Sequence, residues 1–204
     1  MHDIVIKNKD RFKEICRGIF THNRAMIEAH PDIFAYVPNF ANHTWCRSRG
    51  IFKKTKHASV VNSGKAWLPG HHFRNAAVER IVTIDPKVEV FGKKTNPFHR
   101  KEDVLIDYRF SYTIENAAYD TYITEKLMDC FAVGTIPIYH GCDDAWRMFE
   151  GRGILRYDDS FDPAILTEDF YRSLVPYAEE NLERLMKTVR MADDVLYDEV
   201  QKRL

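Results

Sequence analysis

The chain has 204 residues, of which 45% are hydrophobic and 29% are charged. These values are ordinary for a soluble globular protein, and the length suits one domain, or one and a half, with a core of its own. The 30 basic and 30 acidic residues cancel. Because nucleic-acid-binding proteins usually carry a basic excess, we expect no nucleic-acid partner, and any anion site must be local.

The four cysteines and the hydropathy of the chain also exclude several classes of protein. No two of the cysteines have C-x-x-C spacing, so we expect no zinc site and predict reduced thiols, with Cys130 buried on a helix. No apolar run reaches the length of a membrane span, and the N-terminus has no signal-peptide core. We therefore expect a soluble, cytoplasmic protein.

The first ~50 residues predict the end of a larger unit, because they are shorter than an ordinary independent domain. Residues 11–20 suit either a helix or the entry to a strand. Residues 23–29 predict a short helix that stops before Pro31, and residues 34–38 a short strand broken by proline.

From Lys56 onward, apolar strands alternate with helices. The expected strands cover residues 58–61, 88–92, 109–114, 136–139 and 153–157. The expected helices cover residues 71–81, 102–108 and 124–133. The chain after Pro163 is predicted helical, with one apolar stripe made by Leu182, Leu185, Met186, Val189, Ala192 and Leu196. Such alternation predicts an α/β fold with a Rossmann-like, doubly wound parallel sheet.

The helix at 124–133 has the clearest boundaries. Thr124 is a suitable N-cap and Gly134 a suitable left-handed stop. The N-terminus of a helix presents unpaired N–H groups and partial positive charge, so a first-turn lysine, Lys126, makes this a ready place for phosphate. Ligands of parallel sheets bind beyond the carboxyl ends of the strands, where the loops 62–74 and 115–126 are expected to meet.

Several spaced motifs resemble those of a known family. Glu115-Asn116, Tyr122-Ile-Thr-Glu-Lys126 and the segment 134–141 are similar to the E-N, Y-x-T-E-K and G-x-x-P-x-x-x-G signature of the α-1,3/4-fucosyltransferases, glycosyltransferase family 10. Residues 65–74 resemble the K-x-x-L-P-G-H-x-x-R segment of its bacterial and phage-like branch. Residues 21–24 and 38–45 are similar to the passage between the two lobes of that family.

The resemblance, which covers roughly residues 20–160, implies a GT-B fold with two Rossmann-like lobes. Residues 1–48 would be the end of the acceptor-side lobe and a linker, residues 49–175 the donor-binding C-terminal lobe, and residues 176–204 a C-terminal helix. The implied reaction transfers fucose from GDP-fucose to a glycan hydroxyl with inversion.

The same resemblance assigns the donor-binding residues. Arg74 and Lys126 match the positions that bind phosphate, where an arginine fork and a lysine point charge would stabilise the leaving diphosphate. Glu125 matches the position that holds the ribose hydroxyls. The remaining donor contacts implied are Ser63, His71, Asn116 and Tyr122.

The general base is not identified. In complete family members it lies in the N-terminal lobe, and Glu28 and Asp32 do not match it. It would come from residues outside this chain, from a second lobe or partner chain, or from an unexpected carboxylate such as Glu115, which otherwise would orient the sugar. No D-x-D sequence occurs, so no metal is required.

Two alternatives to this function remain open. The chain could be a truncated, non-catalytic lobe that binds a GDP-sugar, or a related transferase that uses another one, such as GDP-mannose. Taken singly, the site residues have simpler explanations, with Lys126 solvated, Arg74 paired with Glu79 and Tyr122 acting as a hydrophobic staple. Packing is also the favoured role of each tryptophan, Trp45, Trp67 and Trp146.

Overall fold

The centre of the fold is a five-stranded sheet with the order β4-β3-β5-β6-β7. The computed structural model describes residues 2–37, 44–119, 121–187 and 192–204. The strands are β3 (Lys56–Val61), β4 (Val88–Phe91), β5 (Tyr108–Ile114), β6 (Ile136–His140) and β7 (Leu155–Arg156). Every neighbouring pair is parallel, so the predicted parallel sheet is confirmed.

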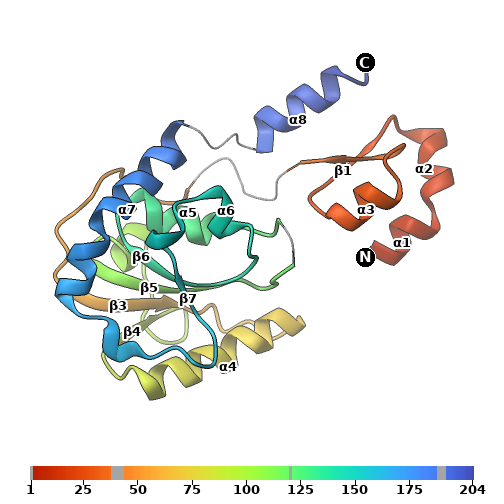
Figure 1. The fold of residues 1–204 in the computed structure, drawn as a ribbon. Helices are drawn as coiled ribbons and strands as arrows, with labels where there is room; N and C mark the ends of the chain where they lie inside the picture. The colour runs from red at the N-terminus through yellow and green to blue at the C-terminus, as the bar shows by residue number, and fades with distance from the viewer. Residues whose placement is uncertain (1, 38–43, 120, 188–191) are drawn as a thin grey trace.

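Helices cover both faces of this sheet (Figure 1). Helix α4 (Pro69–Ile84) packs on one face through Ala77, Val78 and Ile81. Helix α5 (Glu125–Ala132) packs on the other through Leu127 and Phe131. The sheet is therefore doubly wound, as the alternation of strands and helices predicts.

Helix α5 begins and ends where its sequence predicts. The hydroxyl of Thr124 accepts a hydrogen bond from the Lys126 N–H, which satisfies one of the unpaired donors of the first turn. Gly134 ends the turn with φ of 68°, and a Cβ at this position would lie 2.7 Å from Ile51. Glycine is needed there both for the left-handed backbone and for the close approach.

The chain after Pro163 is largely helical, as predicted. Helix α7 (Glu168–Lys187) runs without a break through residue 175, the expected end of the donor lobe, and is followed by α8 (Ala192–Gln201). The buried face of α7 consists of Tyr171, Leu174, Ala178, Asn181 and Leu185.

That alternating spacing of three and four residues includes Leu185 but leaves the next residue, Met186, exposed. Leu196 is also exposed, so these two members of the predicted stripe do not pack in the core, whereas Leu185 does. Val189 and the side chain of Ala192 lie outside the described residues.

Two further elements are shorter than predicted. Only a single 3₁₀ turn, η1 (Lys101–Val104), replaces the helix expected at 102–108. The next strand, β5, already begins at Tyr108, and the half-buried ammonium of Lys54 donates hydrogen bonds to the carbonyl groups of Leu105 and Ile106 after the turn. The strand expected at 153–157 keeps only the two residues of β7, because a 3₁₀ turn, η2 (Gly151–Gly153), precedes it.

The N-terminal residues form a small unit that lies beside the sheet (Figure 1). It contains α1 (His2–Lys7), α2 (Lys9–Ile15), β1 (Ile19–Thr21), α3 (Arg24–Ala29) and β2 (Phe34–Tyr36). Residues 11–20 thus include the end of a helix and the start of a strand. β1 and β2 form a parallel pair, and Met26, Ile33 and Phe34 make the core of this unit. The motif at 38–45 lies mostly outside the described residues.

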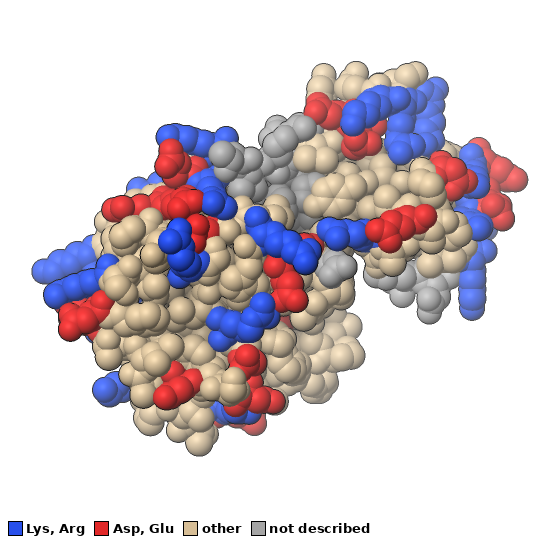
Figure 2. All heavy atoms as spheres, in the orientation of Figure 1, with Lys and Arg blue, Asp and Glu red and all other residues tan. Residues whose placement is uncertain are grey.

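The surface and the tryptophans complete this description. Basic and acidic side chains are interspersed over the face seen in Figure 2. Trp146 packs against Tyr139 as predicted, but Trp45 is 59% exposed and Trp67 79% exposed, so the packing role is wrong for both.

Cys130 is buried on α5, as expected, and all four cysteines are free. Within the described segments, no helix is long and apolar enough to cross a membrane.

Candidate functional site

A cavity of about 460 Å³ opens at the carboxyl edge of the parallel sheet. Its walls include residues that lie one or two positions after three strands, Ser63 after β3, Gly92 after β4 and Asn116 after β5. Six of the seven predicted donor-binding residues line it, namely Ser63, His71, Arg74, Asn116, Glu125 and Lys126. The two loops expected to meet at this edge do meet there.

The cavity is strongly cationic although the chain has no net charge. Five basic residues line it, Lys65, Arg74, Lys93, Lys101 and Lys126. Among the described residues of its lining, Glu125 is the one carboxylate. Positive charge is therefore concentrated at this position in a chain whose charges otherwise cancel.

Arg74 is held on the buried side of α4, where only 7% of the residue is exposed. Its Nη2 donates a hydrogen bond to the Ser63 hydroxyl at 2.9 Å, so it does not make the surface pair with Glu79. Burial lowers the pKa of Arg74, against the raising effect of Glu115, Tyr122 and Glu125. The guanidinium Nε is buried and has no hydrogen-bond partner among the described residues, which leaves a donor for a ligand.

Two more predicted residues present buried polar atoms in the same way. His71 Nδ1 and Asn116 Oδ1 have no hydrogen-bond partner in the described part of the chain. The pKa of His71 is lowered, first by burial and then by the nearby charge of Arg74. A neutral imidazole and an amide are groups that bind the polar atoms of a ligand without adding charge.

Gly70 allows the two loops to approach each other. A Cβ at Gly70 would lie 1.7 Å from the carbonyl oxygen of Asn116, which is far inside van der Waals contact. The first turn of α4 therefore packs directly on the loop that follows β5. This contact brings Arg74 and Lys126, which are 52 positions apart in the sequence, to the same cavity.

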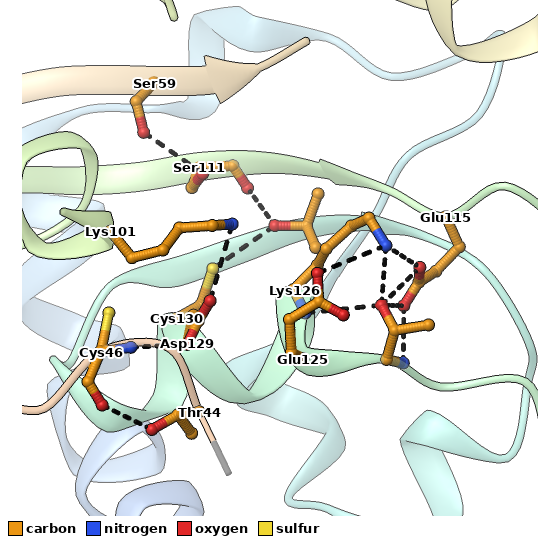
Figure 3. A network of polar contacts seen from close by, with 12 residues as sticks. Thr44, Cys46, Ser59, Lys101, Ser111, Glu115, Glu125, Lys126, Asp129 and Cys130 are labelled. Atoms are coloured by element: carbon orange, nitrogen blue, oxygen red, sulfur yellow. Dashed lines mark hydrogen bonds and ion pairs between the residues drawn. The ribbon is translucent and has the colours of Figure 1, made fainter. Parts of the chain in front are cut away.

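Lys126 is fixed by an ion pair rather than left in solvent (Figure 3). Its ammonium lies 2.9 Å from the Glu115 carboxylate, 2.8 Å from the Thr124 hydroxyl and 3.9 Å from Glu125. Burial alone lowers the pKa of Lys126, but the charges of Glu115 and Glu125 outweigh it, so the pKa is raised. The lysine therefore stays charged at neutral pH.

Glu115 lies beneath the cavity rather than in its lining. It is fully buried, and its carboxylate accepts hydrogen bonds at 2.8 Å from both the backbone N–H and the hydroxyl of Thr124. These bonds join the start of the 115–124 loop to its end. In this position Glu115 orients Thr124 and Lys126, and it has no exposed surface in the described structure.

Tyr122 is the one predicted donor residue that does not line the cavity. Its ring lies 5.1 Å from that of Tyr119 and 5.9 Å from that of His22, measured between ring centres. Burial raises its pKa. The structure therefore places Tyr122 between the loop and the N-terminal unit.

The sequence interpretation missed a second charged pair in the cavity. Lys101, from η1, lies 3.6 Å from the carboxylate of Asp129, which is fully buried on α5 (Figure 3). Asp129 also accepts a hydrogen bond from the Cys46 N–H at 3.0 Å, and burial raises its pKa. An aspartate between the core residues Met128 and Cys130 was the available signal, because a buried acid needs a partner.

A larger cavity, of about 840 Å³, lies at the opposite, amino edge of the sheet. His57, Lys87 and Arg109 line it together with three acids, Asp85, Asp162 and Glu168. His57 is engaged there by both oxygens of Asp85 at 3.1 Å. Balanced charge and its position at the amino ends of the strands make it the poorer candidate for a nucleotide. No three His, Cys, Asp or Glu side chains of the described residues gather to hold a metal ion.

Comparison with known proteins gives the family. A family model described as glycosyltransferase family 10 (fucosyltransferase), C-terminal part, matches residues 51–163, which is more than half of the chain. The chain belongs to glycosyltransferase family 10. The resemblance found in the motifs is confirmed, and the matched region contains every predicted donor-binding residue.

The relatives of this family 10 chain are longer than it is. It is 29% identical over 164 residues to the alpha-(1,3)-fucosyltransferase FucT of Helicobacter pylori, covering 78% of this chain and 31% of the relative. Crystal structures of an alpha1,3-fucosyltransferase with GDP and with GDP-fucose give TM-scores of 0.48 and 0.47, each at 23% identity. The first match covers 73% of this chain and 46% of the other, and the second 72% and 47%.

Proposed function

We propose that this protein binds GDP-fucose at the carboxyl-edge cavity and transfers fucose to a glycan hydroxyl with inversion, as the C-terminal lobe of a GT-B fucosyltransferase. The observation that carries the proposal is that Arg74 and Lys126 line one cationic cavity. Membership of the fucosyltransferase family supports the choice of donor. The similarity to an alpha-(1,3)-fucosyltransferase supports an α-1,3 linkage for the transferred fucose.

The residues act on the diphosphate as it leaves. Negative charge grows on the diphosphate while the bond to the sugar breaks, and preorganised cations that face this charge lower the barrier. Arg74 would donate its buried Nε, while its Nη2 is held by Ser63. Lys126, kept in place by Glu115, would supply a fixed positive charge.

Other residues would hold the nucleoside. Glu125 would accept hydrogen bonds from the two ribose hydroxyls, since it is the carboxylate that the described lining offers. His71 and Asn116 would bind polar donor atoms through the buried atoms named above. We propose that transfer needs no metal ion, because the five lining cations can neutralise the diphosphate.

A binding-only role is the second candidate, and one observation favours it. The described lining contains no carboxylate other than Glu125, which lies 3.9 Å from Lys126. A base that takes the acceptor proton would then come from a second lobe or a partner chain. A third candidate is a transferase that uses GDP-mannose as donor, because contacts to the phosphates and the ribose do not distinguish one sugar from another.

Calorimetry and a transfer assay separate these candidates. We expect GDP to bind the wild type, and Arg74→Ala and Lys126→Ala each to weaken binding at least tenfold, as loss of a hydrogen bond to a charged group implies. Lys187→Ala, which removes an exposed lysine paired with Glu183, is the matched control and should bind normally. Equal GDP affinity in all four proteins would overturn the proposed site.

Transfer is then measured with GDP-fucose and GDP-mannose on a panel of glycans, with and without EDTA. Transfer of fucose that survives EDTA supports the enzyme. GDP binding without transfer from either donor supports the binding-only role. Transfer from GDP-mannose alone supports the related transferase.

A further inference from the structure

Thr121 has a backbone conformation that a threonine rarely adopts. Its φ is 63°, and it is the one positive-φ residue other than glycine among the described residues. A β-branched side chain is disfavoured in the left-handed region and persists there only where neighbouring groups hold it. Thr121 lies in the 115–124 loop, directly before Tyr122.

Asp144 supplies the hold from another part of the fold. Its carboxylate Oδ2 accepts a hydrogen bond from the Thr121 N–H at 3.0 Å, and only 8% of Asp144 is exposed. Asp144 occupies the N-cap position of α6 (Ala145–Met148) but makes no side-chain cap bond to that helix in the described structure. The carboxylate is therefore directed to the loop, although at this position such a group ordinarily caps its own helix.

The same carboxylate connects the loop to the N-terminal unit. Arg24, at the start of α3, lies 3.5 Å from Asp144 Oδ2, and Arg147 lies 3.3 Å from Oδ1. The Thr121 hydroxyl donates a hydrogen bond to the carbonyl of His22. The His22 ring stacks on that of Tyr119 with a centroid distance of 5.8 Å. Asp144 and Thr121 thus stand where the loop, α6 and the N-terminal unit meet.

A short chain of backbone contacts leads from Thr121 to the candidate site. The Ile123 N–H donates to the Thr121 carbonyl at 3.1 Å. The next residue, Thr124, caps α5 and contacts Lys126 through its hydroxyl. A change of φ at Thr121 would therefore displace Thr124 and the lysine that it helps to hold.

We propose that Asp144 is a positioning residue for the donor site, which holds Thr121 in the left-handed conformation and so fixes the 121–126 segment in its binding geometry. The inference rests on the proposed function, because it assigns a purpose to the loop in holding a nucleoside diphosphate. Asp144 touches no residue that we assign to the donor other than through this backbone. Asp144 therefore fixes the position of the residues that bind GDP and does not itself contact GDP.

A double-mutant cycle tests the inference with GDP as the probe. We expect Asp144→Ala to weaken GDP binding about tenfold. Thr121 then relaxes to negative φ in the free protein, and the free energy needed to return it to positive φ is subtracted from the free energy of GDP binding. Glycine reaches positive φ without that cost. In the Thr121→Gly background, Asp144→Ala should therefore weaken binding by no more than about threefold.

Controls and a second readout distinguish positioning from general stability. Asp143→Ala removes the neighbouring, exposed carboxylate that pairs with Arg156, and it should leave GDP affinity unchanged. Asp144→Asn keeps an oxygen for the Thr121 N–H and should retain most of the affinity. Amide exchange in the protein without GDP should quicken in the 121–124 segment of Asp144→Ala, and the wild-type rate should persist in Asp143→Ala.

The outcomes separate this inference from the proposed function. The positioning role would be overturned if Asp144→Ala lowered GDP affinity by the same factor in the wild-type protein and in Thr121→Gly. Unchanged amide exchange in the 121–124 segment of Asp144→Ala would also overturn it. Failure of the wild type to bind GDP would sink the proposed function, while faster exchange in Asp144→Ala would still support the hold on Thr121.

Discussion

The ammonium of Lys126 and the fully buried carboxylate of Glu115 lie 2.9 Å apart at the start of α5. A cation at a helix start is disfavoured by the helix dipole, and this ion pair offsets that cost. It also fixes the direction of a side chain that would otherwise sample many rotamers. The site thus holds its lysine before any ligand arrives, which lowers the entropy lost on binding.

Breaking this pair should strongly destabilise the fold. We expect Glu115→Gln to lower the free energy of unfolding by about 3 kcal/mol, because one charge of a largely buried pair loses its partner. Glu89→Gln breaks the exposed pair with Lys56 at 3.3 Å and should cost less than about 1 kcal/mol. Urea denaturation measures both. Equal losses in the two variants would contradict the structural role of Glu115.

The shape of the Arg74 guanidinium should matter beyond its charge. Arg74→Lys keeps the charge but cannot donate to Ser63 and to a phosphate from a rigid fork. We expect GDP affinity to fall about tenfold, the loss that one hydrogen bond to a charged group implies. Arg80→Lys, on the exposed side of the same helix, is the control. Calorimetry that finds Arg74→Lys as tight as wild type would argue that charge alone suffices.

The contact between the two loops should tolerate no side chain at Gly70. In Gly70→Ala the new Cβ would lie 1.7 Å from the Asn116 carbonyl oxygen, and because backbone cannot yield cheaply we expect a loss of about 2–3 kcal/mol. Gly18→Ala meets only the flexible side chain of Arg203, at 3.3 Å, and should be nearly neutral. Thermal unfolding decides between them, and a Tm of Gly70→Ala within a degree of wild type would refute the tight approach.

The carboxylate of Glu102 should make the stability of the fold depend on pH. Burial by itself raises its pKa, but backbone N–H donors, including those of Arg47 and Ser48, together with the Arg100 guanidinium outweigh burial and lower the pKa to about 2. A carboxylate with a depressed pKa contributes stability that is complete above its unfolded value, near 4.5, and is lost as the pH falls toward 2.

The wild type should therefore exceed Glu102→Gln in stability by about 1–3 kcal/mol at pH 7, the range for hydrogen bonds to a charged group. The difference should shrink steadily between pH 4.5 and pH 2. Chemical denaturation at a series of pH values, with exposed Glu79→Gln as control, measures it. A difference that is independent of pH would show that the carboxylate charge is not what stabilises this corner.

Local sequence signals predicted much of this fold because they depend on neighbours along the chain. Thr124 and Gly134 set the limits of α5 through hydrogen bonds and backbone angles within a few residues. The limits of β3, β4, β5 and β6 followed, to within two residues, from short apolar runs, whereas β7 was predicted too long. The helix expected at 102–108 is shorter because Tyr108 is already the first residue of β5 and pairs with Lys56 of β3, 52 positions away.

The motifs also named six of the residues that line the cavity, but they could not show how each is held. Lys101 and Asp129 were missed because their pairing joins η1 to α5 across the cavity wall. The role of Asp144 was equally hidden, since its partner Thr121 belongs to a different loop. Contacts between side chains that are far apart in the sequence cannot be predicted from the spacing of residues along the chain.

By itself, the sequence determined the parallel α/β class, the family and the residue types that can hold a diphosphate, because strand pattern, caps and motif spacing are local properties of the chain. Only the tertiary structure decided that Glu115 is buried beneath Lys126, that Arg74 Nε has no partner among the described residues, and that Tyr122 faces the N-terminal unit. Burial and charge pairing depend on which distant segments pack together, and that is settled by the fold as a whole.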